Sequence, residues 1–372
     1  MPKLYIGLMS GTSLDGIDAA LVSIDNGQIE LLNTASSAIP PSLHQELLAL
    51  CHGCDNEIER LGAADRLLGA ELAKSALTVC DGAGLSSAQI CAIGSHGQTI
   101  RHRPPSTNQA EQTAFSLQIG DPNTVAELSG ITTVSDFRRR DVAAGGQGAP
   151  LVPAFHAAAF AKAGTNRVIV NIGGMANITV LDSNGGISGF DTGPGNVLLD
   201  AWIQKNQRKP YDTNGQWAAS GVAIPALIEH FLRDEYFSLQ GPKSTGREKF
   251  NLQNLETILS GMPVAPPENV QHSLLQITAQ SIAKAITQHA KDYKEIYICG
   301  GGAHNLSLMH ALEEQLPSCT IHNTGYLGIE PDWVEAVAFA WLAHQALENS
   351  PGNVAAVTGA KGPRVLGTIS PA

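Results

Sequence analysis

Residues 168–190 read VIVNIGGMANITVLDSNGGISGF, and this stretch decides the fold. It holds three short apolar runs, at Val168–Ile172, Ile178–Leu181 and Ile187–Phe190. A Gly-Gly pair separates the first two runs, and Asp-Ser-Asn-Gly at 182–185 separates the last two. Short β-rich runs divided by Gly, Asn and Asp are typical of antiparallel strands joined by tight turns. The stretch therefore predicts three consecutive strands.

The same order of runs and turns occurs near the start of the chain. Leu4–Leu8 precedes Ser-Gly-Thr, and Ile17–Ile24 is followed by the turn Asp-Asn-Gly and then by Ile29–Leu32. In both places helical segments follow, and then another apolar strand that ends in glycine, at Ala92–Gly94 and at Ile296–Gly300. This order predicts an internal duplication, although two unrelated hairpins would also give such a pattern by chance.

Hairpin-joined strands followed by helices and further strands predict an α/β protein with mixed sheets flanked by helices. We expect two similar lobes with a small-molecule site in the cleft between them. The first lobe is predicted at 1–138 together with the tail at about 350–372, and the second at 139–349. Helices are expected near Ile58–Val79, Val197–Gln204, Val222–Leu232, Leu274–His289 and Trp333–Leu347.

Composition agrees with a two-domain enzyme and excludes several other classes of protein. The 372 residues exceed one ordinary core, 43% are hydrophobic, only 15% are charged, and 38 are Gly. A formal net charge of -11 argues against nucleic-acid binding. No signal-peptide pattern and no apolar stretch of membrane-spanning length is present, so we expect a cytoplasmic protein without a membrane partner. Cys51 and Cys54 form a lone C-x-x-C that lacks the second pair of a zinc site.

The first candidate site is the glycine-rich stretch GLMSGTSLDGID at 7–18. Glycines allow close backbone turns with exposed N–H donors, and Ser and Thr add hydroxyl donors, which suits a polyphosphate. Asp15 and Asp18 are the carboxylates that would hold Mg²⁺, directly or through water. An ordinary polar hairpin is an equally good interpretation of this stretch alone.

The second candidate site is GFDTGPGN at 189–196, which precedes a predicted helix. Asp191 stands at a strand end beside glycines and a helix N-terminus, where a carboxylate can serve as a general base. Thr192 and the Gly193–Asn196 backbone are candidates for meeting a phosphate. The structural alternative is that Asp191 only caps the helix, and we favour catalysis.

Three weaker signals complete the set. The run Gly300-Gly301-Gly302 at a strand end would let a flat adenosine lie on bare backbone, although a plain turn is possible. Short polar side chains and arginine suit sugar hydroxyl, amide and carboxylate groups, and the candidates are His96, Gln98, Asp136 and Arg138. His96 could equally be a structural histidine, and the arginine run at 138–140 a solvated ion-pair cluster. Glu335 falls in the first turn of the last helix, where it would serve either catalysis or the helix end.

Taken together, these motifs resemble the anhydro-N-acetylmuramic acid kinase family, a member of the actin/Hsp70/sugar-kinase superfamily. The resemblance rests on 7–18, on NIGGMAN at 171–177, on 189–196, and on the segments 145–153 and 331–336. It covers nearly the whole chain, and the combination is specific although each glycine motif alone is not. It implies two ribonuclease-H-like lobes, ATP with Mg²⁺, a homodimer, and a role in peptidoglycan recycling.

The resemblance also implies roles for individual residues. Asp191 would be the catalytic base and Glu335 would assist it. The glycine motifs and the resemblance together predict nucleotide binding by Gly11, Thr12, Ser13, Leu14, Asp15, Gly16, Ile17, Asp18, Gly173, Gly193, Gly195, Asn196, Gly300, Gly301, Gly302 and Asn305.

The implied reaction differs from ordinary sugar phosphorylation. In the anhydro sugar O6 is tied to C1, so water must attack C1 while O6 departs onto the γ-phosphate, giving N-acetylmuramic acid 6-phosphate. The rival interpretations are an ordinary kinase acting on an open sugar and a non-catalytic nucleotide-binding protein of the same fold. The non-catalytic proteins need extra partner-binding segments, and the sequence shows no separate peptide-binding domain.

Overall fold

The computed structural model describes residues 2–11, 14, 16–105, 110–239, 241, 243–246, 249–290 and 292–372. Contacts divide the chain into two compact units. Unit 1 comprises Met1–Phe160 and Trp333–Ala372, and unit 2 comprises Ala161–Asp332. Unit 1 is therefore discontinuous in sequence, and these boundaries differ from the 138 and 349 expected from the sequence.

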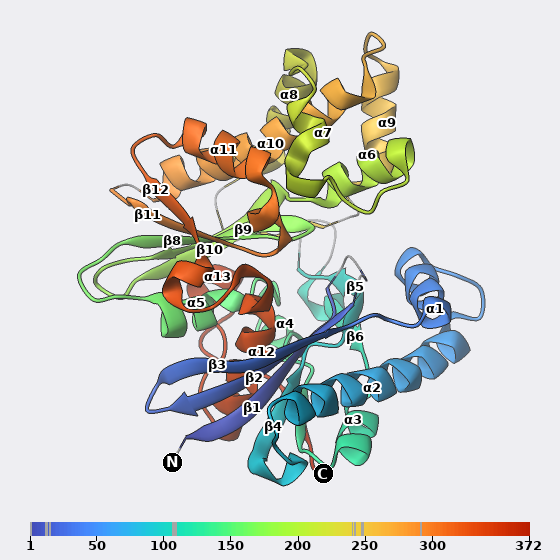
Figure 1. Cartoon of the computed structure of the whole chain (residues 1–372), viewed down its shortest axis with the longest axis vertical. Helices are drawn as coiled ribbons and strands as arrows, with labels where there is room; N and C mark the ends of the chain where they lie inside the picture. Colours follow the sequence, from blue (N-terminus) through green and yellow to red (C-terminus); the bar gives the residue numbers. More distant parts are fainter. Residues whose placement is uncertain are drawn as a thin grey trace. The chain divides into compact units, whose positions relative to one another are not determined.

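Unit 1 is built on a six-stranded mixed sheet with the order β13-β7-β4-β1-β2-β3. Figure 1 labels β1, β2, β3 and β4 of this sheet. The strands β1, β2 and β3 are antiparallel neighbours, β4 and β7 continue the sheet in parallel, and β13 returns antiparallel to β7. Their bounds are β1 Lys3–Met9, β2 Ile17–Asp25, β3 Gln28–Ser37, β4 Ile90–Ser95, β7 Thr133–Ser135 and β13 Thr368–Ser370. A separate hairpin pairs β5 (Gln98–Arg103) with β6 (Phe115–Ile119).

Unit 2 repeats this arrangement in a five-stranded sheet with the order β10-β9-β8-β11-β12. The strands β8, β9 and β10 are antiparallel neighbours, and β11 and β12 continue in parallel. Their bounds are β8 Arg167–Ile172, β9 Met175–Leu181, β10 Ile187–Pro194, β11 Glu295–Cys299 and β12 Thr320–Asn323. The order and directions match β3-β2-β1-β4-β7 of unit 1, which confirms the predicted α/β fold with two similar lobes.

Helices cover both sheets, and alternation along the strands assigns their faces. In unit 1, Ile6 and Leu8 of β1 join the hydrophobic core that contains α2, whereas Gly7 between them faces α12. The unit 1 helices are α1 Pro41–His52, α2 Glu57–Gly82, α3 Pro122–Ser129, α4 Arg139–Ala143, α5 Val152–Phe160, α12 Val334–Leu347 and α13 Ala355–Thr358. The unit 2 helices are α6 Val197–Gln207, α7 Gln216–Ala219, α8 Pro225–Leu232, α9 Leu252–Ser260, α10 Pro267–His289 and α11 Leu306–Gln315.

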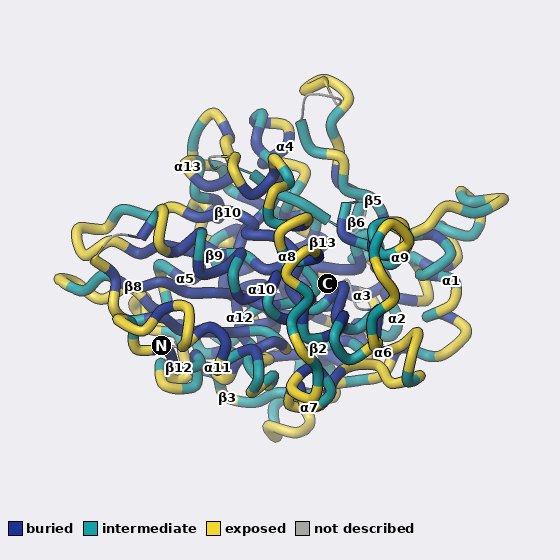
Figure 2. Tube along the Cα trace, turned by 90° about the horizontal axis from the view of Figure 1, so that it is seen from above, coloured by how far each residue is buried: buried dark blue, intermediate teal, exposed yellow. Residues whose placement is uncertain are grey.

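Burial follows the sheets. In Figure 2 the central strands are dark blue, and the turns and the outer sides of the helices are yellow. Val168, Val170 and Ile172 of β8 are fully buried and pack in the core of unit 2 with residues of α6, α10 and α11. Each sheet therefore has its own hydrophobic core, as expected for a unit that folds on its own contacts.

Helix α12 lies directly on the backbone of the unit 1 sheet. A Cβ atom added to Gly7 would lie 1.7 Å from the carbonyl oxygen of Ala336, and one added to Gly94 would lie 1.9 Å from that of Phe339. Glycine is the residue that permits such an approach of two backbones. The sequence analysis assigned this helix to the second lobe, and the structure corrects that assignment. Its apolar spacing predicts a helix but does not specify which sheet it covers.

A buried carboxylate ties the C-terminal tail to unit 1. Asp141 is fully buried and accepts hydrogen bonds from the Gly148 N–H (2.8 Å), Asn353 Nδ2 (2.6 Å) and the Thr358 hydroxyl (2.8 Å). Three donors compensate for the cost of removing the charge from water. The tail thus joins α4 through the Asp141 side chain, and it joins β7 through β13.

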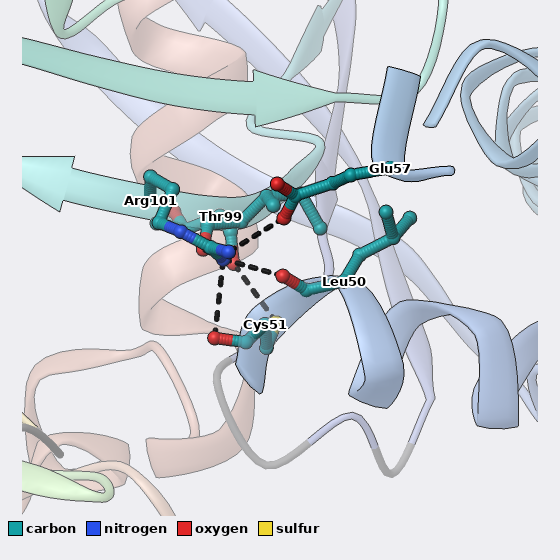
Figure 3. Close-up of polar contacts among 6 residues, drawn as sticks. Leu50, Cys51, Glu57, Thr99 and Arg101 are labelled. Carbon is teal, nitrogen blue, oxygen red and sulfur yellow. Dashed lines mark hydrogen bonds and ion pairs between the residues drawn. The ribbon is translucent and has the colours of Figure 1, made fainter. Parts of the chain in front are cut away.

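Arg101 on β5 holds the end of α1 and the start of α2 together (Figure 3). Its guanidinium donates to the carbonyl of Leu50 and to that of Cys51 (3.1 Å), and it pairs with Glu57 at 2.6 Å. Cationic side chains stabilise the free carbonyls at a helix C-terminus. The connection between α1 and α2, which contains Cys54, is therefore held at both ends by Arg101.

We expect Arg101→Met to lower the free energy of unfolding by about 1–3 kcal/mol, because the helix carbonyls lose their donor. Arg103 on the same strand is exposed and bonds only its neighbour's carbonyl, His102 O, among the contacts that the structure describes for it. Arg103→Met is therefore the matched control and should change stability by less than about 0.5 kcal/mol. Urea unfolding of both variants measures the difference, and equal losses would contradict this role of Arg101.

Candidate active site

Asp191 lies on β10, the edge strand of the unit 2 sheet, and is 7% exposed. A segment distant in sequence binds the free side of this strand. The Asp191 N–H donates to the Lys243 carbonyl (3.1 Å), and the Thr245 N–H donates to Asp191 Oδ2 (3.0 Å). The Tyr236 hydroxyl donates to the Asp191 carbonyl at 2.6 Å. The carboxylate is thus nearly buried and held by backbone on its own edge of the sheet.

A row of polar side chains crosses the sheet beside Asp191. In the strand register Asp191 is opposite Asn177 on β9, and Asn177 is opposite Asn171 on β8. Directly opposed residues of antiparallel strands lie on one face with their Cβ atoms about 5 Å apart. The buried Oδ1 of Asn177 has no hydrogen-bond partner among the described residues. The row places amide groups where a polar ligand of Asp191 would bind.

The two turns beside Asp191 bind each other through their backbones. The N–H groups of Gly195, Asn196 and Val197 donate to the carbonyls of Gly173 and Gly174. A Cβ added to Gly195 would lie 2.3 Å from the Gly173 oxygen, so glycine is required there. The sequence analysis assigned the 193–196 backbone to a phosphate, yet the amides of Gly195 and Asn196 are already engaged within the protein. The phosphate role of this turn remains a prediction.

The glycine run after β11 meets the same turns. Gly302 packs against Ile172. A Cβ atom added to Gly301 would have Asn196 Nδ2 as its nearest neighbour, at 3.9 Å. Gly300 has φ 76°, a conformation that favours glycine. Asn305 accepts the Leu308 N–H at 3.0 Å and so caps α11. The structure therefore brings three predicted motifs of unit 2 together, at residues 171–177, 189–196 and 300–305.

The first glycine-rich motif lies at one end of the unit 1 sheet. Gly11 precedes Leu14, whose N–H donates to the Gly11 carbonyl at 3.1 Å. Ile17 is buried in the core, and Asp18 on β2 accepts a hydrogen bond from the Ser36 hydroxyl of β3. A Cβ on Gly16 would lie 2.9 Å from the Ser37 carbonyl. The remaining predicted residues of this motif lie outside the described residues, namely Thr12, Ser13 and Asp15.

His96 and Arg138 form one hydrogen-bonded unit. Arg138 donates to His96 Nε2 at 3.0 and 3.2 Å and to the Gly148 carbonyl at 2.8 Å, so the proton of the imidazole is on Nδ1, which bonds Gly97 O at 2.7 Å. Burial, with Arg138 adding to it, lowers the pKa of His96 to about 3. Both ring nitrogens are engaged and the ring is neutral, which favours the structural interpretation of His96.

The other two predicted sugar-binding residues of unit 1 are also held by the protein. Gln98 is buried and accepts the Ser10 hydroxyl at 2.7 Å. Asp136 pairs with Arg139 at 2.7 Å and lines a shallow polar hollow with Arg140 and Thr368. Their assignment to the sugar remains a prediction.

Glu335 occupies the first turn of α12 in unit 1, whereas Asp191 belongs to unit 2. Trp333 at the helix start gives no side-chain cap. The free N–H groups and the dipole of a helix N-terminus favour a carboxylate in this turn. The contact of α12 with Gly7 and Gly94 fixes the helix, and therefore the base of the Glu335 side chain, relative to the unit 1 sheet.

Sequence reasoning missed the residues that hold Asp191 from outside its own motif. These are Tyr236, Lys243 and Thr245, which lie 45 to 54 positions along the chain. The polar run Lys243-Ser244-Thr245-Gly246 is a signal that could have been noted, since it combines hydroxyls, a cation and a glycine. The run is too far from Asp191 along the chain for helix or strand periodicity to connect the two.

Metal-ion clusters and membrane-spanning helices are both absent from the described residues. No group of three or more His, Cys, Asp or Glu side chains is arranged to hold a metal ion in the part of the chain that the structure describes. Over those same residues, the helices all lack the length and apolar character needed to cross a bilayer.

Buried neutral histidines should make the protein sensitive to acid. Burial lowers the pKa of His156 to about 3, as it does for His96, from an ordinary value of 6.5. Below pH 6.5 the unfolded chain binds protons that the folded protein does not, so stability falls as the pH drops from 6.5 towards 3. Each histidine contributes up to about 1.4 kcal/mol per pH unit.

The test is denaturant unfolding at pH 7, 6 and 5. His156 lies among the rings of Phe155 and Phe160, so His156→Phe keeps an aromatic ring in place. In the wild type, the free energy of unfolding should fall with decreasing pH below pH 6. In the variant this slope should be smaller by about 1.4 kcal/mol per pH unit. An unchanged slope would show that His156 does not contribute.

Comparison with known proteins gives a consistent result. A family model described as anhydro-N-acetylmuramic acid kinase matches residues 3–372. A protein of that name from Pseudomonas savastanoi pv. phaseolicola is 50% identical over 372 residues, which cover all of both chains. Those from Pseudomonas fluorescens and Saccharophagus degradans are each 50% identical, over 368 and 370 residues, and cover 99% of each chain.

Proposed function

Because this chain belongs to the anhydro-N-acetylmuramic acid kinase family, we propose that it converts 1,6-anhydro-N-acetylmuramic acid and ATP to N-acetylmuramic acid 6-phosphate and ADP. The nearly buried carboxylate of Asp191 carries the proposal. Asp191 makes three hydrogen bonds with other segments, one at its carboxylate and two at its backbone, and it lies opposite a row of amide side chains. A kinase acting on an anhydro sugar needs such a base, because the sugar offers no proton at O6.

Asp191 would take a proton from the water that attacks C1. The bond from the water oxygen to C1 forms as the C1–O6 bond breaks, and O6 forms its bond to the γ-phosphorus as the bond to ADP breaks. The Thr245 N–H binds Oδ2 and so helps to orient the carboxylate. Glu335, at a helix N-terminus, would assist Asp191 as the second carboxylate.

The glycine motifs fit a nucleotide. A Cβ atom added to Gly173 or to Gly301 would meet no close neighbour. Its nearest atom would lie 3.7 Å away at Gly173 and 3.9 Å away at Gly301. Bare backbone of this kind accepts a flat ring or a phosphate. Gly193, Gly300 and Gly302 shape the turns around it, while the Gly11–Asp18 motif of unit 1 would bind the phosphates. Asn305 would serve this site by capping α11.

The donor set also fits Mg²⁺, a hard cation that prefers carboxylate and hydroxyl oxygens. Asp18 and Asp15 would hold it, directly or through water, and the Ser36 hydroxyl on Asp18 orients that carboxylate. When bound, the ion neutralises charge on the transferring phosphates.

Further parts of the proposal concern the setting of the enzyme. We place it in peptidoglycan recycling in the cytoplasm, as a homodimer whose partners are small molecules and not nucleic acid. The net charge of -11 supports the exclusion of nucleic acid. Gln98, Asp136, Arg138 and His96 would line or support the sugar site.

A coupled ADP-release assay with the anhydro sugar, open N-acetylmuramic acid and glucose tests the function. Sugar-dependent turnover is expected with the anhydro sugar alone. In ¹⁸O-water the label should appear at C1 and be absent from the phosphate ester, and the α-anomer should form first because the bridge holds O6 on the β face. Turnover with open sugars only would identify an ordinary sugar kinase, and label in the phosphate ester would exclude attack at C1.

A further inference from the structure

Residues 243–246 form a strap along the free edge of β10, and we use that name for Lys243-Ser244-Thr245-Gly246. The strap exchanges two hydrogen bonds with Asp191, one at the Asp191 N–H and one at its carboxylate. An edge strand offers unpaired backbone groups, and here the strap satisfies one of them. The orientation of the Asp191 carboxylate therefore depends on where the strap lies.

Lys243 anchors the strap. Its Nζ donates to the Tyr236 carbonyl at 2.9 Å and lies 4.6 Å from the centroid of the Tyr236 ring. It also lies 5.2 Å from the centroid of the Phe190 ring. A partly desolvated cation over two aromatic faces is strongly held. Tyr236 in turn donates its hydroxyl to the Asp191 carbonyl. Lys243 and Asp191 are therefore both hydrogen-bonded to Tyr236.

We propose that Lys243 is a positioning residue for the catalytic base: its ammonium holds the strap so that the Thr245 N–H fixes the Asp191 carboxylate towards the attacking water. The proposal rests on the function proposed above for Asp191. Lys243 itself takes no proton from the substrate and touches none of the reacting atoms. It acts through its own backbone carbonyl and through the Thr245 N–H, two residues further along the strap.

The charge on Lys243 depends on pH within an accessible range. Burial, with the nearby charge of Lys284 adding to it and Asp191 opposing it, lowers the pKa of Lys243 to about 8. On α10, His289 packs against Phe190, and its pKa is lowered by burial and by Lys243, so it titrates on the acid side. Lys249 lies 5.5 Å from the centroid of the Tyr236 ring and pairs with Asp234 at 2.6 Å. Above pH 8 Lys243 therefore becomes neutral and loses its attraction to the two rings.

Two variants of Lys243 separate charge from shape. Lys243→Met keeps the length of the side chain without the charge, and kcat should fall about 10–100-fold, as expected when a reacting group is misplaced. The KM for ATP should stay within about twofold, because the nucleotide motifs are untouched. Lys243→Arg keeps a cation that is charged at every accessible pH, and most of kcat should be restored.

The pH profile gives the sharper test. Wild-type kcat should fall above about pH 8 as Lys243 loses its proton, and Lys243→Arg should remove this alkaline fall. If Lys243 served folding alone, Lys243→Arg would not change the fall of kcat above pH 8. The matched control is Lys205→Met, since Lys205 also lies over an aromatic ring (Trp202, 5.5 Å) in unit 2 but contacts neither Asp191 nor the strap. Its profile should equal that of the wild type.

A double variant shows whether Lys243 acts through Asp191. Asp191→Asn combined with Lys243→Met should be no slower than Asp191→Asn alone, because the anchor then has no base to position. Multiplicative losses, a full kcat in Lys243→Met, or an alkaline limb that persists in Lys243→Arg would each overturn the proposal.

Hydrogen exchange at the Thr245 amide gives a readout that needs no turnover. Lys243→Met should reduce its protection, and Lys205→Met should leave it unchanged. If the wild type showed no turnover with the anhydro sugar, the proposed function would fail, while loss of Thr245 protection would still establish the anchor. Unchanged protection in Lys243→Met would remove the anchor whatever the substrate.

Discussion

Replacing Asp191 with Asn is expected to lower kcat at least ~10²-fold, the range associated with loss of a general base. The amide keeps the size of the side chain, and its oxygen can still accept the Thr245 N–H, but it cannot take a proton from water. Binding of ATP should survive, because the substitution leaves every glycine of the nucleotide motifs in place. Stopped-assay turnover and nucleotide titration measure the two effects separately.

The control is Asp182→Asn, which removes a carboxylate from the turn at the other end of the β9–β10 hairpin. Asp182 accepts a hydrogen bond from the Tyr293 hydroxyl and belongs to no predicted site. It should turn over at nearly the wild-type rate. Near-normal kcat in Asp191→Asn would rule out the base and with it the attack of water through this residue.

The second large effect is expected for stability. Gly7→Ala should destabilise unit 1 by about 3 kcal/mol or more, because the new methyl would stand 1.7 Å from the Ala336 carbonyl and backbone cannot give way as a side chain can. Helix α12 must shift or detach. Since Glu335 precedes Ala336, activity should fall together with the melting temperature.

Gly62→Ala is the matched control. Gly62 lies in α2, and a Cβ there would meet nothing within 4 Å. The same chemical change should therefore raise stability, by up to about 1 kcal/mol, through the better helix propensity of Ala. Calorimetry of the two variants should show shifts in opposite directions. A Gly7→Ala protein as stable as the wild type would contradict the backbone contact.

The strands were predictable because turn chemistry marks their ends. The runs at 168–172, 178–181 and 187–190 became β8, β9 and β10, with bounds that differ by a few residues. The duplication could be predicted because both hairpin sets precede helices and a strand ending in glycine. The placement of α12 could not, because it depends on two glycines, Gly7 and Gly94, more than 240 residues away in sequence.

The candidate site was predictable only where its residues are contiguous. Asp191 stood out within a glycine motif at a strand end. The use of the Gly195 and Asn196 amides could not be predicted, because a glycine-rich turn looks the same whether its donors face a ligand or another turn. The strap was missed for a related reason, since backbone donors carry no signature in side-chain identity.

The discontinuity of unit 1 has a consequence for synthesis on the ribosome. Domains form as soon as their residues have emerged. Residues 161–332 complete unit 2 while unit 1 still lacks α12, β13 and the tail groups that bind Asp141. During synthesis, Gly7 and Gly94 of the first sheet therefore stay uncovered until α12 has emerged. The lobe that begins first is finished last, and the exposed β1–β4 face is the surface that chaperones would meet.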